Sequence, residues 1–243
     1  MAKAAKKKPT SKKKPAKPSV SMGRRVRRYA VRAILGVVAF FALLIIVFRF
    51  AGPPTTHTIW SESRRLGGVE WDRVAIEDIA PSAVRAVVAA EDADFCGHWG
   101  FDMSAIRDAI EDGGQRGAST ISQQTVKNVF LWQGRSWMRK ATEALLTPAV
   151  EAIWPKRRII EVYLNIAEFG EGVFGVEAAA QHYFGVSAAD LTPAQGARLA
   201  VVLPNPKERN AARLPPWLQK HAARVQDGAA TIKADGRASC FES

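Results

Sequence analysis

The chain has 243 residues and a formal net charge of +12, of which residues 1–32 hold 13 Lys and Arg and no acid. The remainder has 22 basic and 23 acidic residues, so the chain is a near-neutral body with a basic tail. This distribution of charge excludes a uniformly basic nucleic-acid binder. Only two cysteines, Cys96 and Cys240, are present, which excludes a disulfide-dense small domain and a cysteine-rich zinc module.

The first segment, 1–29, is rich in Lys, Pro, Ala and Ser and is expected to be disordered, because it has almost nothing to bury. Residues 33–48 then contain no charged side chain. A membrane span needs about 20 residues, and 30–51 fits if Arg32 and Arg49 extend their side chains to the lipid headgroups. The alternatives are a cleaved signal peptide, whose apolar stretch would be shorter, and a helix of the core.

The basic residues before the span indicate how the chain lies in the membrane. Positive charge stays in the cytoplasm, so the tail is expected there and the body on the outer side of the inner membrane, in the periplasm. A basic tail could bind nucleic acid, but a topology signal that rests on anionic lipid is the simpler interpretation, and no nucleic-acid partner is expected. Outside the cytoplasm Cys96 and Cys240 either form a disulfide or remain two thiols, since spacing alone does not decide.

The rest of the chain is helical in its patterns. Residues 52–75 carry Pro and Gly and are expected to be a linker or a short irregular arm, followed by one domain over 76–243. Helix-opening capping boxes are predicted at Thr120 and Thr192, and helical patterns cover 137–154, with a kink at Pro148, and 156–169. The fold class is therefore all-α, with seven to ten helices around one core.

Glu91 is the first candidate for chemistry. A helix that begins at Pro81 places Val84, Val87, Val88 and Glu91 on one face. A carboxyl group on an apolar face loses water, which raises its pKa and suits a general acid or base near neutral pH. The alternative is a Glu that meets solvent at a frayed helix end.

Five segments carry a more specific signal. They read EDADFCGHWGFD, GASTISQQTVKN, RKATE, KRRIIEVYLN and RLAVVLPNP, at 91–102, 117–128, 139–143, 156–165 and 198–206. In this order and spacing they resemble the five motifs of the peptidoglycan glycosyltransferases, the family of the monofunctional biosynthetic transglycosylases and of the N-terminal domains of class A penicillin-binding proteins. Ser122 stands where Thr is usual and Ala118 where Gly is common.

The resemblance implies a lysozyme-like, mostly helical fold with a large lobe and a small lobe beside the membrane. It also implies polymerisation of lipid II into β-1,4-linked glycan for the bacterial cell wall and cell shape, with inversion at the donor anomeric carbon and release of undecaprenyl pyrophosphate. No transpeptidase is expected after residue 243, so the monofunctional member is the better match. Expected partners are lipid II, lipid-linked glycan and inner-membrane lipid, with cell-division or elongation proteins as further candidates.

The resemblance also implies roles for single residues. Glu91 is expected to be the general base, and Glu143 the second essential carboxylate, which either orients cations or holds a divalent metal, Mg²⁺ or Mn²⁺, on the donor pyrophosphate. A departing pyrophosphate needs positive charge more than a proton. The expected substrate-binding residues are Lys127, Arg139 and Lys140, with Arg107, Arg116, Ser119, Thr120, Gln123, Gln124 and Asn128.

Each role has a plainer alternative. Arg139 and Glu143 are spaced i, i+4 and could form a surface ion pair, and Thr120 with its neighbours could serve only to cap a helix. No His, Cys and carboxylate cluster has metal-ligand spacing, so His98 is expected to be a structural hydrogen-bonding residue. Phe130, Leu131 and Trp132 either enter the membrane surface or fill the core.

Two other functions remain open at this point. A membrane-anchored muramidase would also use two carboxylates in a helical fold, although a neutral glycosidic leaving group does not require several cations. A non-enzymatic scaffold that recruits cell-wall partners would tolerate Glu91→Gln.

Overall fold

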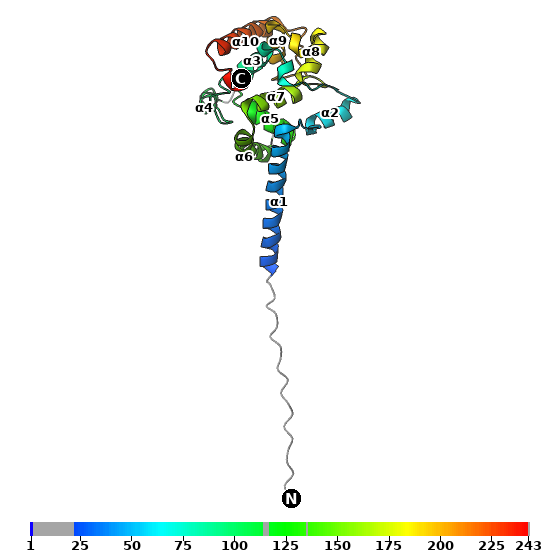
Figure 1. Cartoon of the computed structure of the whole chain (residues 1–243), viewed down its shortest axis with the longest axis vertical. Helices are drawn as coiled ribbons and strands as arrows, with labels where there is room; N and C mark the ends of the chain where they lie inside the picture. The colour runs from blue at the N-terminus through cyan, green and yellow to red at the C-terminus, as the bar shows by residue number, and fades with distance from the viewer. Residues whose placement is uncertain (2–21, 114–116, 135, 243) are drawn as a thin grey trace. The chain divides into compact units, whose positions relative to one another are not determined.

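The computed structural model describes Met1 and residues 22–113, 117–134 and 136–242. Residues 2–21 of the tail expected to be disordered lie outside the described residues, whereas residues 22–29, also expected to be disordered, are helical and continue into the apolar stretch. The chain divides into two compact units, Met1–Leu43 and Leu44–Ser243. The helices of the second unit that follow the N-terminal helix are shown in Figure 1. The helices are α1 (Met22–Phe50), α2 (His57–Leu66), α3 (Pro81–Glu91), α4 (Met103–Glu111), α5 (Ile121–Phe130), α6 (Trp137–Ile153), α7 (Lys156–Ile166), α8 (Val176–Phe184), α9 (Pro193–Ala200), α10 (Pro216–Ala234) and α11 (Ser239–Glu242).

Helix α1 contains the expected span. It is 29 residues long and is apolar enough to cross a membrane by length and composition. At a rise of about 1.5 Å per residue, such a helix exceeds the roughly 30 Å of a hydrocarbon core. An N-terminal helix of this kind fits a membrane anchor.

The last residues of α1 belong to the second unit. Ile45 is buried there, and its carbonyl oxygen accepts a hydrogen bond from the Trp154 indole at 2.7 Å. The Phe48 carbonyl accepts from the Arg158 guanidinium at 3.0 Å, and its ring stacks on Phe130. The Phe48 carbonyl is one of the last four of α1, which have no partner within the helix.

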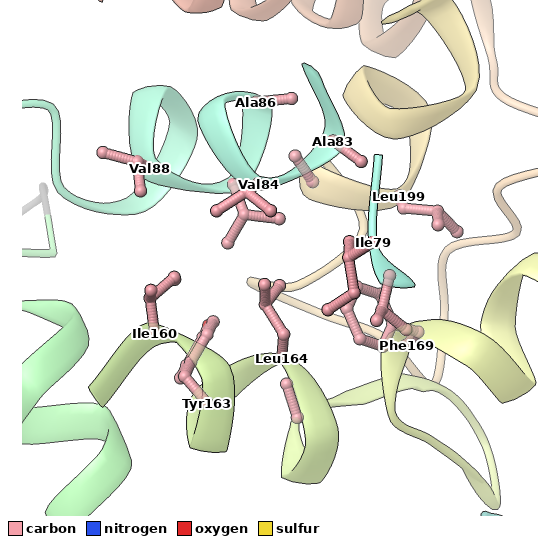
Figure 2. Close-up of a cluster of buried hydrophobic side chains, with 14 of the residues drawn as sticks. Ile79, Ala83, Val84, Ala86, Val88, Ile160, Tyr163, Leu164, Phe169 and Leu199 are labelled. Atoms are coloured by element: carbon pink, nitrogen blue, oxygen red, sulfur yellow. The ribbon is translucent and has the colours of Figure 1, made fainter. Parts of the chain in front are cut away.

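The core of the second unit forms around α3. Helix α3 packs against α9 and α10, while α5 packs against α6 and α7. Figure 2 shows Val84 and Val88 pointing from α3 toward Ile160 and Leu164 of α7. Because α3 is apolar on more than one side, it is buried along most of its length and holds its last residue, Glu91, in a fixed place.

A small sheet lies beside the helices. Its order is β1 (Glu70–Trp71), β3 (Val173–Phe174), β2 (Glu168–Gly170), with β1 parallel and β2 antiparallel to β3. Short 3₁₀ turns, Ile76–Asp78 and Ala188–Asp190, complete the described elements. The all-α fold class is confirmed, since these strands are only two or three residues long.

Two segments differ from the sequence-based expectation. The segment 52–75 contains α2, which Thr56 caps by accepting the Ile59 N–H, and β1. The helical pattern over 156–169 ends at Ile166, because Glu168–Gly170 pairs with β3 instead. Of these elements only β1 depends on a distant segment, because it pairs with β3, and a local pattern does not contain such a contact. Helix α2 and the β2–β3 pair are local features that the sequence patterns did not indicate.

Several other expectations are confirmed. Pro81 opens α3, and Thr120 and Thr192 each form a capping box with the Gln three residues on. The helical pattern over 137–154 corresponds to α6, with Pro148 inside it, and the kink at Pro148 stays a prediction. Cys96 and Cys240 form a disulfide with a Cα–Cα distance of 5.7 Å, which decides between the two alternatives left open above.

The residues at 130–132 divide between the two alternatives. Leu131 is buried, and the Phe130 ring packs between Phe48 and Trp154. Trp132 is 41% exposed. Membrane contact therefore stays a prediction for Trp132 alone, while the other two residues belong to the core.

The close approach of α9 to α3 gives a stability prediction. A Cβ atom at Gly196 would lie 2.7 Å from the Cα atom of Ala83, a backbone atom that cannot move aside. Overpacking costs about 1–3 kcal/mol, which exceeds the roughly 1 kcal/mol that Ala gains over Gly in a helix. Gly196→Ala should therefore lower the melting temperature followed by circular dichroism.

Gly228→Ala is the matched control, because a Cβ atom there would meet the Ala89 Cβ at an ordinary 3.4 Å. This variant should keep or raise the melting temperature. Equal stability of the two variants would contradict the close packing of α9 on α3.

Candidate active site

Glu91 is the last residue of α3 and is half-buried. Its Oε2 accepts a hydrogen bond of 2.8 Å from the Gln124 side-chain amide. Burial raises the pKa of the Glu91 carboxyl from its ordinary value of 4.5, against the opposing effects of Gln124 and Lys127. The position at the buried end of an apolar helix thus produces the property that a general base requires.

Gln124 is held in one orientation by a second partner. The Tyr163 hydroxyl donates to the Gln124 Oε1 at 3.1 Å, so the amide nitrogen faces Glu91. Burial raises the pKa of Tyr163 well above 10, which keeps this phenol protonated as a donor. Two successive hydrogen bonds, from Tyr163 of α7 to Gln124 of α5 and from Gln124 to Glu91, therefore hold the Glu91 carboxylate in place.

Asp92 secures the backbone next to Glu91. Its Oδ2 accepts the Ile121 N–H at 2.9 Å, at the start of α5, and its Oδ1 accepts from the His98 Nε2 at 2.8 Å. The His98 Nδ1 accepts the Gly100 N–H at 3.2 Å, so the hydrogen lies on Nε2. His98 is thus a structural hydrogen-bonding residue, as expected, and Asp92 joins the end of α3 to the start of α5.

Glu143 is the second candidate carboxylate of the site and is buried, with 2% of its surface exposed. Its Oε2 accepts from the Arg139 Nη1 at 2.7 Å and its Oε1 from the Lys140 Nζ at 2.5 Å. All three side chains come from the first half of α6, where i, i+3 and i, i+4 neighbours share a face. Because the carboxylate is buried, this is not the exposed surface pair of the plainer alternative.

Lys127 lies in the electrostatic field of both carboxylates. Burial lowers its pKa from 10.5, while Glu143 and Glu91 favour its charged form and Arg139 and Lys140 oppose it. The next residue, Asn128, accepts a hydrogen bond from Gln133 at 3.2 Å. Helix α5 therefore carries a cation between the two acidic groups.

Ser119 connects the two halves of the site. Its hydroxyl accepts from the Lys140 Nζ at 3.1 Å, and its carbonyl oxygen accepts from the Gln124 Nε2 at 3.4 Å. The same amide nitrogen binds Glu91. A continuous path of hydrogen bonds thus runs from the cations around Glu143 to the Glu91 carboxylate.

The structure places the other expected residues differently. Thr120 and Gln123 are buried and use their side chains in the capping box of α5. Arg107 is exposed on α4, and its binding role stays a prediction. Arg116 lies outside the described residues.

Residues of this cluster line two separate hollows. One, of about 90 Å³, is lined by Gln124, Lys127 and Asn128, and another, of about 460 Å³, by Glu91, Ser119 and neighbouring residues. Gln124 of the first hollow is bonded to Glu91 of the second. The Gln124–Glu91 hydrogen bond therefore links a side chain that lines one hollow to a side chain that lines the other.

Two residues outside the five motifs also affect the site. Arg209 lowers the pKa of Glu91 through its charge, and it is held by the Val201 carbonyl at 2.7 Å. Glu168 lines the smaller hollow, and burial raises its pKa. Arg209 lies just past the fifth motif and Glu168 just past the fourth, so no motif pointed to either.

A divalent metal does not fit Glu143 as it stands. Both carboxylate oxygens are paired with cations. Within the described ranges no group of three or more His, Cys, Asp or Glu could hold a metal ion. The arrangement instead combines one poorly hydrated carboxylate with Lys127, Arg139 and Lys140, a set suited to proton removal next to a bound anion.

Comparison with known proteins gives one consistent result. The family model described as Transglycosylase matches residues 62–230. A biosynthetic peptidoglycan transglycosylase of Jannaschia sp. is 57% identical over 89% of this chain and 90% of its own length. Proteins of the same name from Caulobacter vibrioides and Rhodospirillum centenum are 43% and 42% identical over 90% and 91% of this chain, and over 99% and 98% of their own lengths.

The matched residues include all five motifs with Glu91 and Glu143, and the fold of this family is lysozyme-like. With more than half of the chain matched and full-length relatives above 40% identity, the chain belongs to the transglycosylase family and is a glycosyltransferase that acts on peptidoglycan.

Proposed function

We propose that this protein polymerises lipid II, with a growing lipid-linked glycan as donor and a fresh lipid II as acceptor. The observation that carries the proposal is the hydrogen-bonded path from Glu91 through Gln124 and Ser119 to Lys140 and Glu143. It places a desolvated base and a cation cluster within one site. That pairing suits a reaction in which an alcohol loses a proton as a pyrophosphate departs.

Glu91 acts on the acceptor in this scheme. The 4-hydroxyl of the acceptor sugar gives its proton to the Glu91 carboxylate as its oxygen attacks the donor anomeric carbon. Attack from the side opposite the pyrophosphate inverts the α-linkage and forms a β-1,4 bond. Gln124, fixed by Tyr163, keeps the carboxylate aimed while the proton moves.

The cations act on the leaving group. The bond between the anomeric carbon and the pyrophosphate oxygen breaks, and undecaprenyl pyrophosphate leaves with the bonding electron pair. Lys127, Arg139 and Lys140 stabilise the charge that develops there. Glu143 holds Arg139 and Lys140 in place, the first of the two roles expected for it, and no step here passes through a metal.

We further propose a single-pass inner-membrane protein. The basic residues before the apolar part of α1 keep the N-terminus in the cytoplasm, residues 30–51 span the membrane, and the catalytic domain lies in the periplasm. The Cys96–Cys240 disulfide supports an oxidising compartment for that domain. Both substrates carry lipid tails, so this placement brings the site to where they lie.

The test is incubation of the full chain with labelled lipid II, beside a parallel incubation with purified glycan. The proposal predicts a lipid-linked polymer from lipid II and no soluble fragments from glycan. Fragments without polymer would support the muramidase, and neither product would support a non-enzymatic scaffold. The excess of cations at Glu143 favours the transferase over the muramidase.

A further inference from the structure

The chain ends in a segment that contacts the loop after Glu91. We name residues 235–242 the C-terminal clamp. They include α11 and lie beyond the residues matched by the family model. The loop in question, 92–97, leads directly from the end of α3. None of the clamp residues is among the candidate catalytic or substrate-binding residues.

Two contacts fix the loop from within the clamp. The Arg237 Nη1 donates to the Ala93 carbonyl at 3.0 Å, two residues after Glu91. Cys240 is bonded to Cys96, five residues after Glu91. Arg237 is itself oriented by Asp235, whose carboxylate accepts from its Nε at 2.9 Å. A covalent bond and an oriented guanidinium therefore hold the same short loop.

The remaining clamp contacts hold the surroundings of that loop. Phe241 is buried against Phe95 at 6.3 Å between ring centroids, and its carbonyl accepts from the Arg157 guanidinium at 2.8 Å. Glu242 pairs with Arg85, a buried residue of α3. The clamp thus contacts α3 before Glu91 and the loop after it.

Arg237 also lines the hollow beside Glu91. The clamp therefore closes one wall of the space that contains the carboxylate. Movement of this wall would admit water to Glu91 and free the loop that fixes its backbone. Carboxylate solvation and aim both affect a general base.

We propose that the disulfide-locked C-terminal clamp positions Glu91, with Arg237 and the Cys96–Cys240 bond as its positioning residues for the reaction of the proposed function. This inference rests on the proposed role of Glu91. Breaking the clamp should disturb the chemical step more than substrate binding, because its contacts hold the loop after Glu91 and none of them is to the cation cluster.

The test compares the full chain in detergent micelles with two variants, Cys96→Ser/Cys240→Ser and Arg237→Ala. The Arg237→Ala variant keeps the disulfide, so it remains informative if the double variant folds poorly. Reduction by dithiothreitol, which breaks the S–S bond to two thiols as the reagent becomes a cyclic disulfide, is a third arm. Lys233→Ala, an exposed residue of α10, is the control.

The expected result is a kcat for lipid II polymerisation roughly 10- to 100-fold lower, with KM nearly unchanged. The acid limb of the kcat profile should move to lower pH as water reaches Glu91, whose other charged neighbours, Asp92, Lys127 and Arg209, are unchanged. A purely structural role would lower the amount of folded enzyme without moving that limb.

Hydrogen exchange gives a readout independent of activity. Amides of residues 92–97 should exchange faster in both variants and after reduction than in the wild type and in Lys233→Ala. The inference would be overturned if the folded variants kept the wild-type kcat, the wild-type acid limb of the pH profile and the wild-type exchange rates at 92–97. If the wild type forms no polymer, the proposed function fails, and exchange at 92–97 alone then decides whether the clamp holds the loop.

Discussion

Glu91→Gln is expected to reduce lipid II polymerisation by roughly 10²- to 10⁴-fold, the usual contribution of a general base. The amide has nearly the same shape as the carboxylate and can still meet Gln124, but it cannot accept the acceptor proton. The measurement is the initial rate of polymer formation from labelled lipid II. Folding is checked by circular dichroism.

The stability of this variant should move in the other direction. Burial raises the pKa of Glu91, so folding favours its protonated form. The stability that this gives is fully present below the unfolded pKa of about 4.5 and is lost as the pH rises through the folded pKa. At neutral pH the ionised carboxylate is therefore a cost, and the Gln variant should melt at the same or a higher temperature.

The matched control is Glu111→Gln, at the exposed end of α4. It should polymerise lipid II at the wild-type rate. Full activity of Glu91→Gln would contradict the role of Glu91 as general base. If the variant is inactive, the circular dichroism and melting data show whether it has also lost its fold.

Glu143→Gln should have the second-largest effect, a loss of roughly 10²- to 10³-fold in kcat. The carboxylate neutralises Arg139 and Lys140 at 2.7 and 2.5 Å, next to Lys127. A neutral amide would turn its NH₂ group toward one of these cations and leave like charges to repel. The cations would then no longer be held where the pyrophosphate charge develops.

The variant should also lose stability, by about 1–3 kcal/mol, since a buried charge loses its partner. Glu151→Gln is the control, because Glu151 is a buried carboxylate of the same helix that pairs with Lys156 at 2.8 Å. It should lose similar stability, measured by urea unfolding, but keep most of its activity well below the melting temperature. Equal activity loss in the two variants would show that Glu143 serves only the fold.

Local patterns predicted the parts of the site that depend on one helix. The spacing of Val84, Val87, Val88 and Glu91 predicted a poorly hydrated carboxylate. In the structure the three valines are buried and Glu91 is half-buried, and desolvation raises its pKa. The capping boxes at Thr120 and Thr192 were likewise visible, because a helix start is decided within four residues.

Features that join distant segments could not be predicted in this way. Asp92 carries no pattern that indicates it caps α5, and Arg209 reaches Glu91 only through tertiary folding. The disulfide was left open for the same reason, since 144 residues separate its cysteines. Thr120 and Gln123 show the opposite case, where a motif position that suggested substrate contact is occupied by capping.

The most direct test of the account is the pH dependence of kcat for lipid II polymerisation by the wild type and Glu91→Gln. A base must be ionised, and burial raises the pKa of Glu91 above 4.5. The wild-type rate should therefore fall with decreasing pH along a limb that lies above 4.5, and the residual rate of the variant should lack this limb. A wild-type rate that stays level down to pH 4.5, or the same limb in the variant, would contradict the central role of Glu91.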